Sequence, residues 1–116
     1  MEPYQGAEFL IELADDATDT WCEVQSTATP TCQVQLRRLI ERFAEKGDLQ
    51  SRVQMRNEGD GIYAIKANCG LRAYGYYHKK RRKVFVISHF VHKKSNKMRP
   101  ADRERAVKNR NSGGSS

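Results

Sequence analysis

The segment from Arg72 to Lys94 constrains the fold more than any other part of the chain. Residues 71–77 are rich in Tyr, and residues 84–91 are mainly β-branched and aromatic, a composition typical of β-strands. A short basic segment at residues 78–83 separates them and predicts a turn. Because a strand rises about 3.3 Å per residue, each limb of this β-hairpin is long enough to span a small domain. We expect the hairpin to be the working surface of the protein.

The part of the chain before the hairpin predicts strands and two helices. Partial alternation of apolar residues predicts a strand at residues 7–13, and two acidic residues favour a short helix over residues 15–25. The clearest helix covers residues 31–46, where apolar residues recur every two to four positions and Gly47 follows as a stop. Residues 49–57 are irregular, with a possible short extended segment, and residues 1–6 predict a ragged start.

Short turns flank a further predicted strand at residues 62–67, which favours an antiparallel meander that leads into the hairpin. After the hairpin, Pro100 and early acidic residues mark the start of a C-terminal helix that packs on the sheet edge or on a partner. The length of 116 residues indicates one domain, which we place at residues 1–110. Residues 111–116 are rich in Gly and Ser, and we expect them to form a flexible tail.

Positive charge is concentrated in the second half of the chain. Residues 1–65 carry 6 Lys and Arg against 12 Asp and Glu, whereas residues 66–116 carry 15 against 2. A basic region of this kind attracts phosphodiesters in a salt-dependent way, although a solvated basic face that only maintains solubility is the alternative. Nucleic acid is the favoured partner because the cations alternate with aromatic residues and His.

The three cysteines, Cys22, Cys32 and Cys69, have no metal-ligand spacing and are odd in number. We expect reduced thiols in a cytoplasmic protein, with a Cys22–Cys32 disulfide as the alternative. The chain shows neither a signal peptide nor an 18-residue apolar run, so no membrane association is expected.

Sequence signatures of several enzyme classes are missing: a Gly-rich phosphate loop, a nucleophile elbow and a zinc-protease motif. The second half also lacks paired carboxylates, so catalysis has to use cations, imidazole and phenol. RNA cleavage suits this inventory. A 2′-OH attacks the neighbouring phosphate, Arg or Lys stabilises the growing negative charge, and His moves the protons. This reaction needs no metal and no small-molecule cofactor.

The order of these elements and motifs resembles the RelE/HigB superfamily of toxins, most closely its phage-derived Gp49-like branch. The resemblance covers residues 33–110. It rests on a helix, then Gly-Ile-Tyr-Ala-Ile-Lys at 61–66, Leu-Arg-Ala-Tyr at 71–74, Phe-Val-His-Lys-Lys-Ser-Asn-Lys at 90–97, and a helix after Pro100. It implies an α+β fold with an N-terminal strand and two helices on a small curved antiparallel sheet, followed by a C-terminal helix. The implied activity is ribosome-dependent mRNA cleavage, neutralised by a cognate antitoxin.

Positions that match the family pattern supply candidate site residues. By this resemblance Lys66, Arg72, Lys93 and Lys94 contact or polarise the scissile phosphate, with Arg72, Lys93 and Lys94 as the catalytic candidates. We expect Arg72 and Lys94 at the surface. The imidazole of His92 is added as a proton carrier; its odd spacing from His89 places the two on opposite faces of a regular strand. The candidate RNA contacts are Lys66, Arg81, Arg82, Lys97 and Tyr76.

Each candidate RNA contact has a structural alternative. Lys66 can be an outward-facing strand lysine, and the basic turn at residues 79–83 can be a solvated hairpin tip. Tyr74 and Tyr76 share one face and Tyr77 takes the other, so at least one packs in the core while an exposed one can stack a base.

Two departures from the family pattern favour a different function on the same fold. Residues 26–31 form an insertion, and the N-terminal third is strongly acidic. The alternative is therefore a catalytically inactive phage or mobile-element protein that binds nucleic acid or inhibits a host complex. A DNA-binding accessory protein is disfavoured, because no helix-turn-helix pattern with a basic recognition helix is evident.

Overall fold

A computed structural model describes residues 1–49, 54–93 and 97–112 of the chain. Within these ranges the chain forms three helices and six strands. Their order is β1 (Tyr4–Gln5), β2 (Leu10–Leu13), α1 (Asp15–Gln25), α2 (Pro30–Lys46), β3 (Met55–Gly59), β4 (Ile62–Lys66), β5 (Leu71–Tyr77), β6 (Val84–His92) and α3 (Pro100–Asn111).

The six described strands form one mixed sheet in the order β1-β2-β6-β5-β4-β3. β2 runs parallel to β6, with Leu10 opposite Val84 and Leu13 opposite Ile87, and the other neighbouring pairs are antiparallel. The expectation of a purely antiparallel sheet is therefore wrong. Parallel neighbours need a long connection, and here the chain passes through α1, α2 and the β3–β5 meander before it returns beside β2.

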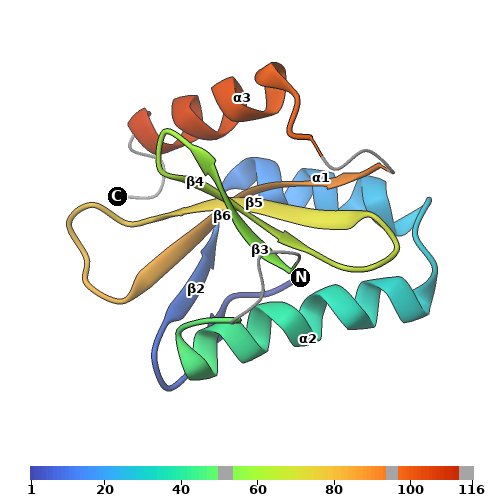
Figure 1. Cartoon of the computed structure of the whole chain (residues 1–116), viewed down its shortest axis with the longest axis horizontal. Coiled ribbons are helices and arrows are strands. Elements are labelled where there is room, and N and C mark those ends of the chain that lie inside the picture. Colours follow the sequence, from blue (N-terminus) through green and yellow to red (C-terminus); the bar gives the residue numbers. More distant parts are fainter. Residues whose placement is uncertain (50–53, 94–96, 113–116) are drawn as a thin grey trace.

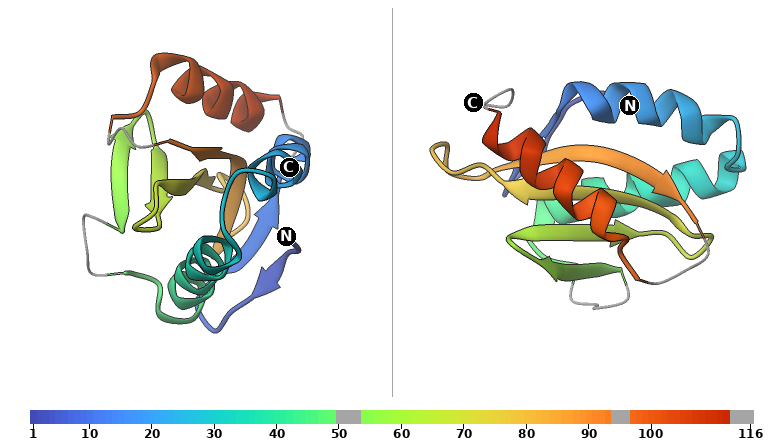
Figure 2. Two further views of the ribbon diagram at one scale, coloured as in Figure 1. Left: turned by 90° about the vertical axis from the view of Figure 1, so that its right-hand side faces the viewer. Right: turned by 90° about the horizontal axis from the view of Figure 1, so that it is seen from above.

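Helices cover both faces of the sheet. α1 contacts β6, and α2 contacts β4 and β5 from the same side, whereas α3 lies on the opposite face over β4, β5 and β6. Figures 1 and 2 show α2 and α3 on opposite sides of the strands. The predicted C-terminal helix is thus confirmed, but it packs on the sheet face and not on its edge. None of the helices in the described ranges is long and apolar enough to cross a membrane.

Each face of the sheet has its own hydrophobic core. The larger core lies under α1 and α2, and the smaller core lies under α3. Representative buried members of the larger core are Trp21, Leu36, Phe43, Ile87 and Phe90. The smaller core contains Ile62, Tyr74, Tyr76, Val86 and Ala106. The alternation of side chains along β5 and β6 sends neighbouring residues to different cores.

Helix α2 is the element that the sequence pattern defines best. Its start is capped by the Thr29 Oγ1 atom, which accepts a hydrogen bond from the Cys32 amide at 3.1 Å. Its end is Gly47, which takes a left-handed φ of 79°. The buried stripe consists of Leu36, Leu39, Ile40 and Phe43. The helix predicted at residues 31–46 is confirmed and begins one residue earlier.

The predicted hairpin is confirmed as β5 and β6, which pair from Leu71 opposite His92 to Tyr77 opposite Phe85. The register shifts between Tyr74 and Gly75, so β6 holds an extra residue, Ser88, at that point. This bulge lies in the middle of the hairpin, beneath α3.

The N-terminal segment is more ordered than expected. The predicted strand at residues 7–13 begins only at Leu10, and the segment expected to be ragged contains β1, which pairs with β2. Gly6 is packed against the backbone of Ala44, so the N-terminal segment rests on α2. The possible extended segment within residues 49–57 is confirmed as the start of β3.

The cysteine expectation is wrong. Cys32 and Cys69 form a disulfide with a Cα–Cα distance of 6.0 Å, and Cys22 is the free, exposed thiol. The disulfide joins α2 to the β4–β5 turn, two segments that are 37 residues apart in sequence.

Candidate functional site

Three of the predicted site residues lie together on the face of the sheet that α3 covers. Lys66 and Arg72 are paired positions of β4 and β5, and Lys93 directly follows the end of β6 beside Arg72. The charges of Arg72 and Lys93 both act on Lys66. We call Lys66, Arg72 and Lys93 the cation cluster.

Arg72 is the buried centre of the cation cluster, with only 1% of its surface exposed. Its Nε atom donates to the Gly70 carbonyl at 3.3 Å, and one terminal nitrogen donates to the Lys93 carbonyl at 3.1 Å. The other terminal nitrogen is buried and makes no hydrogen bond of ordinary length among the described residues. The guanidinium lies near the Tyr74 hydroxyl, and its charge opposes the rise in the pKa of Tyr74 that burial causes. A buried cation of this kind attracts an anion through its field. The expectation that Arg72 is a surface residue is wrong.

The pKa values of the two lysines of the cation cluster are lower than that of an ordinary surface lysine. Burial lowers the pKa of the Lys66 ammonium; the Glu58 carboxylate, 3.8 Å away, opposes that shift, and the Arg72 charge adds to it. Burial also lowers the pKa of Lys93, and Arg72 lowers it further. The Lys93 ammonium donates a hydrogen bond to the Lys97 carbonyl. Both lysines are therefore closer to releasing a proton near neutral pH than a solvated lysine is.

A buried polar chain connects the sheet to α3 next to the cation cluster. The Asn109 amide donates to Ser88 Oγ at 2.8 Å, and Ser88 Oγ lies 2.9 Å from His89 Nδ1. His89 Nε2 lies 3.2 Å from the Asp102 carboxylate, which also accepts from Arg99 at 3.1 Å. A consistent assignment has each group donate to the next, from Asn109 to Asp102.

This Ser-His-Asp arrangement is structural and not a hydrolase triad. Ser88 and His89 are fully buried, so a substrate cannot reach the hydroxyl oxygen. Burial lowers the pKa of His89, while the hydrogen bond to Asp102 opposes that shift, so the imidazole is neutral at pH 7. Tyr74 packs against His89 with a ring distance of 5.3 Å, and its hydroxyl is buried without a hydrogen-bond partner in the described part of the chain.

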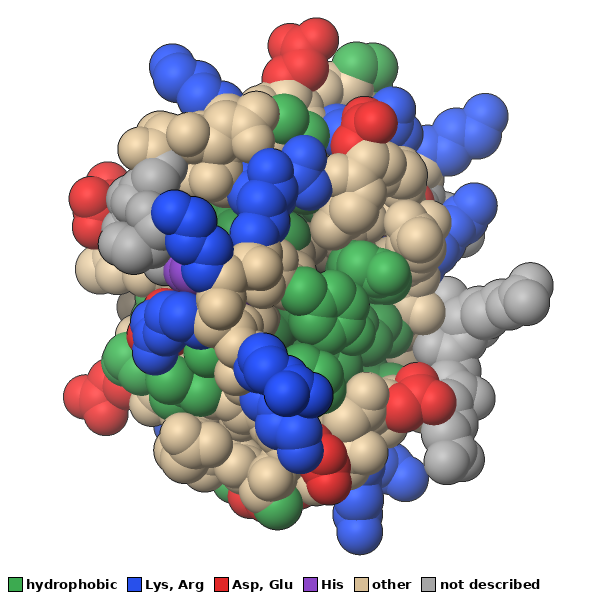
Figure 3. Space-filling view, turned by 90° about the vertical axis from the view of Figure 1, so that its left-hand side faces the viewer, with side chains coloured by type: hydrophobic (Ala, Val, Ile, Leu, Met, Phe, Trp, Pro, Cys, Tyr) green, Lys and Arg blue, Asp and Glu red, His purple; other side chains and the backbone are tan. Residues whose placement is uncertain are grey.

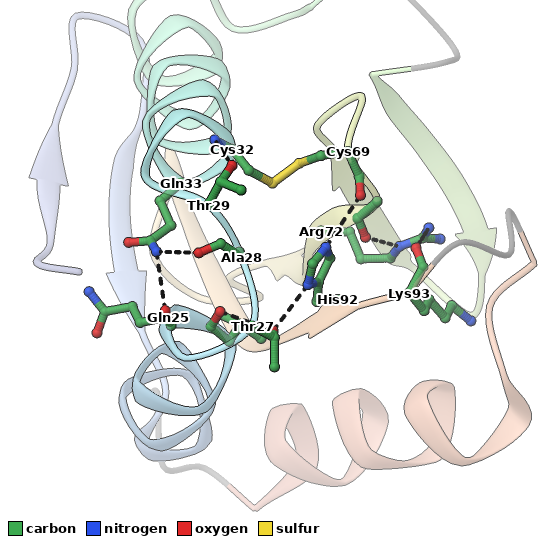
Figure 4. The surroundings of a disulfide bond; sticks show 12 residues. Gln25, Thr27, Ala28, Thr29, Cys32, Gln33, Cys69, Arg72, His92 and Lys93 are labelled. Atoms are coloured by element: carbon green, nitrogen blue, oxygen red, sulfur yellow. Dashed lines mark hydrogen bonds between the residues drawn. A yellow bond between two sulfur atoms is a disulfide. The ribbon is translucent and has the colours of Figure 1, made fainter.

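His92 lies on the other face of the sheet, and the expectation that His89 and His92 point in opposite directions is confirmed. His92 Nδ1 lies 3.0 Å from Thr27 Oγ1, and Nε2 lies 3.3 Å from the Cys69 carbonyl. Figure 4 shows His92 extending toward Thr27 while the Arg72 side chain extends toward Lys93. The structure therefore does not bring His92 together with the cation cluster.

The predicted RNA contacts at the hairpin turn lie at the opposite end of β5 and β6 from the cation cluster. Arg81 forms an ion pair with Glu12 at 2.7 Å, and Arg82 is exposed. Tyr77, which is 38% exposed, is next to this turn and contacts Phe9 and Tyr63 with ring distances of 5.5 and 5.2 Å. Figure 3 shows an uncovered hydrophobic patch at this end with Lys, Arg, Asp and Glu side chains around it. The mixed charge does not indicate one class of partner.

The remaining predicted contacts are scattered. Tyr76 is 1% exposed and packs in the core under α3, so its ring is not available to stack a base. Lys97 is exposed near the start of α3. Lys94 lies outside the described residues.

Some features of this region were missed in the sequence analysis. The disulfide and the ion pair of Glu58 with Lys66 join residues from different elements, and no local sequence pattern predicts such contacts. The sequence pattern indicates only a helix-start role for Asp102, although its carboxylate also contacts His89 and Arg99. A buried polar residue in a predicted apolar strand, such as His89, was the available signal.

A comparison with protein-family models and one with curated proteins each found no match to this chain.

Proposed function

We propose that the chain has a RelE-like fold and is the toxin of a type II toxin-antitoxin system, a ribosome-dependent mRNA endonuclease. The observation that carries the proposal is the buried Arg72 guanidinium, whose charge acts on two neighbouring lysines with lowered pKa values. Three cations gathered on one face attract a phosphodiester. The resemblance of the motif order to the RelE/HigB superfamily supports the same substrate.

The proposed reaction is attack of a ribose 2′-OH on the adjacent phosphorus. The 2′-oxygen forms a bond to phosphorus, the bond to the 5′-oxygen breaks, and the 2′-proton passes to a base. Because Arg72 is buried, it would stabilise the negative charge on the phosphoryl oxygens through its electric field and not by direct contact, and a fixed cation in a poorly hydrated site acts more strongly than one in water. Because hydrogen bonds to the Gly70 and Lys93 carbonyls already fix the guanidinium, it does not have to reorganise during the reaction.

The two lysines would handle the protons. A lysine whose pKa is lowered toward neutrality can accept the 2′-proton in its neutral form and donate a proton to the leaving 5′-oxygen in its charged form. Lys93 is the better candidate for contact with RNA, since the Lys66 side chain is only 10% exposed and is paired with Glu58. This assignment uses neither a metal ion nor a small-molecule cofactor.

The proposed partners are mRNA bound to the ribosome and a cognate antitoxin that blocks the toxin. Such a protein acts in the cytoplasm, where mRNA is translated.

The position of His92 favours a second candidate function. His92 faces the α1–α2 connection and so cannot serve as a proton carrier at the cation cluster. A non-cleaving phage or mobile-element protein that binds nucleic acid or inhibits a host complex through the same cations would not need it.

The test is induced expression in bacteria with an oxidising cytoplasm, where the Cys32–Cys69 disulfide persists, followed by mapping of mRNA 5′ ends on translated and untranslated copies of one transcript. The proposal predicts new ends only on the translated copy for the wild-type chain, and their loss for Lys93→Gln. Arg38→Gln, which removes an exposed charge from α2, is the matched control and should cleave normally. Intact mRNA with a folded, well-expressed protein would contradict cleavage and favour the non-cleaving binder.

A further inference from the structure

The β4–β5 turn, residues 67–70, is held by a covalent bond to a distant helix. Cys69 in this turn is bonded to Cys32 in the first part of α2. Within the turn, Gly70 N donates to the Ala67 carbonyl at 3.1 Å and Ala67 N to the Leu71 carbonyl at 2.8 Å. The Cys69 carbonyl also lies 3.3 Å from His92 Nε2, and Ala67 packs in the larger core. Among the bonds of the described residues, the disulfide is the one that joins the turn directly to α2.

The same turn holds the Arg72 side chain in place. Gly70 supplies one of the two carbonyls that accept hydrogen bonds from the guanidinium, and Lys93 supplies the other. The two carbonyls are coupled, because the Lys93 amide also donates to the Gly70 carbonyl at 3.2 Å. Figure 4 shows the disulfide, the turn and the Arg72–Lys93 contact in one continuous arrangement. A shift of the turn must therefore shift the guanidinium.

We propose that the Cys32–Cys69 disulfide is a redox switch that sets the position of Arg72. In the oxidised protein the turn is fixed to α2 and the guanidinium is preorganised; in the reduced protein the turn moves and Arg72 loses its fixed position. The consequence for RNA cleavage rests on the proposed function, whereas the movement of the turn does not.

The switching step is ordinary thiol–disulfide exchange with a small thiol such as glutathione. The thiolate attacks the sulfur of Cys69, the exposed member of the pair, and the S–S bond breaks. Cys32 leaves as a thiolate and takes a proton. A second thiolate then attacks the mixed disulfide and releases Cys69. In total, the two small thiols give two electrons to the Cys32–Cys69 disulfide and are themselves joined in a disulfide. A small-molecule disulfide reverses the reaction by the same exchange.

The test uses full-length protein with Cys22→Ser, which removes the exposed thiol that could exchange with the pair. Nuclear magnetic resonance spectra are recorded before and after reduction with dithiothreitol, and thiol titration confirms that both Cys32 and Cys69 are reduced. The Arg72 Nε–H signal is assigned by its loss in Arg72→Lys. On reduction, this signal should shift or broaden, and so should the amide signals of Gly70 and Lys93. Amides at the hairpin turn, such as His78, and those of α3 should keep their positions.

The double variant with Cys32→Ser and Cys69→Ser is the matched control. It should give the reduced spectrum at the outset and should not respond to dithiothreitol. An unchanged Arg72 signal in fully reduced protein would overturn the switch. Loss of dispersed signals throughout the spectrum would overturn it too, since the disulfide would then hold the whole fold and not one turn.

A second measurement separates the switch from the proposed function. Oxidised and reduced protein are added to translating ribosomes, and mRNA cleavage should fall about tenfold or more on reduction, because small displacements of a catalytic cation are costly. Equal cleavage in both states would overturn the link between the turn and the site. If neither state cleaves mRNA, the proposed function fails, and a shifted Arg72 signal still supports the switch.

Discussion

Arg72 and His89 are both buried polar residues on the face of the sheet under α3, but their surroundings differ. His89 has partners on both ring nitrogens, whereas Arg72 keeps one nitrogen without a partner in the described residues. A complete buried polar chain gives structural specificity, whereas an unsatisfied buried group calls for an explanation such as an ordered water, strain or a catalytic role. The sequence predicted Arg72 as a site residue but not its burial, because a strand pattern does not show which helix will cover it.

The neutral state of His89 makes stability depend on pH. Its pKa is lowered by burial from the ordinary value of 6.5, so the unfolded chain binds this proton at a higher pH than the folded chain does. The contribution of His89 is fully present above pH 6.5 and is lost as the pH falls toward the lower folded pKa. We expect the free energy of unfolding to decrease as the pH falls below 6.5, by less than about 1.4 kcal/mol per pH unit.

Urea titrations at several pH values measure this effect. His89→Gln should flatten the dependence below pH 6.5, while Arg38→Gln, which changes an exposed side chain of α2, should leave it unchanged. An equal slope in wild type and His89→Gln would show that another group is responsible.

The Lys93 ammonium should lower the free energy of unfolding, although it takes part in the proposed RNA cleavage. Its charged form is disfavoured by burial and by Arg72, so Lys93→Met should raise the free energy of unfolding by up to about 1 kcal/mol. The same variant should lose mRNA cleavage. Chemical denaturation checks the prediction against Lys108→Met on α3, an exposed position where the change should be within about 0.5 kcal/mol. A destabilised Lys93→Met would mean that the ammonium supports the fold.

At the scale of elements, local patterns predicted the helices and the hairpin well. α1 and β5 have the predicted bounds, and α2 differs by one residue. The parallel pairing of β2 with β6 was missed, since nothing in a four-residue strand shows which neighbour it will join. Residues 7–9, predicted as part of the first strand, instead form a connection in which the amides of Glu8 and Phe9 donate to the Ala44 carbonyl.

The bulged centre of the hairpin should not tolerate a side chain at Gly75. A Cβ atom there would lie 2.5 Å from both the Phe85 ring and the Val86 carbonyl oxygen. Because backbone cannot easily move, we expect Gly75→Ala to lower the free energy of unfolding by about 1–3 kcal/mol. Gly59→Ala is the comparison: its Cβ meets nothing within 4 Å, so only the positive φ of 97° opposes it.

Thermal and chemical unfolding of the two variants measures the difference. Gly75→Ala should be the more destabilised of the two. Wild-type stability for Gly75→Ala would show that β5 and β6 can separate locally without cost.

At the scale of the whole molecule, one sheet divides the protein into a structural side and a candidate functional side. α1 and α2 build the larger core on one face, and the cation cluster lies on the other. The order of motifs predicted Lys66, Arg72 and Lys93 as site residues, and the structure brings them together. Cys69 and Asp102 became significant only through contacts between distant segments, which no single stretch of sequence encodes.

The disulfide should contribute to global stability by restricting the unfolded chain. It closes a loop between residues 37 positions apart, for which the chain-entropy estimate is about 3–4 kcal/mol. Cys32→Ser should lower the free energy of unfolding by about this amount under oxidising conditions, and Cys22→Ser should have little effect because that thiol is free and exposed. Identical stability of wild type and Cys32→Ser would contradict a formed disulfide.

The most direct test of the central claim is the chemistry of the RNA ends that the chain produces on purified translating ribosomes. Attack by the 2′-OH leaves a 5′-hydroxyl on one fragment and a cyclic phosphate on the other. The account predicts fragments with 5′-hydroxyl ends that appear only when ribosomes translate the mRNA and that disappear with Lys93→Gln. Intact mRNA, or fragments with 5′-phosphate ends, would contradict cleavage by the cation cluster.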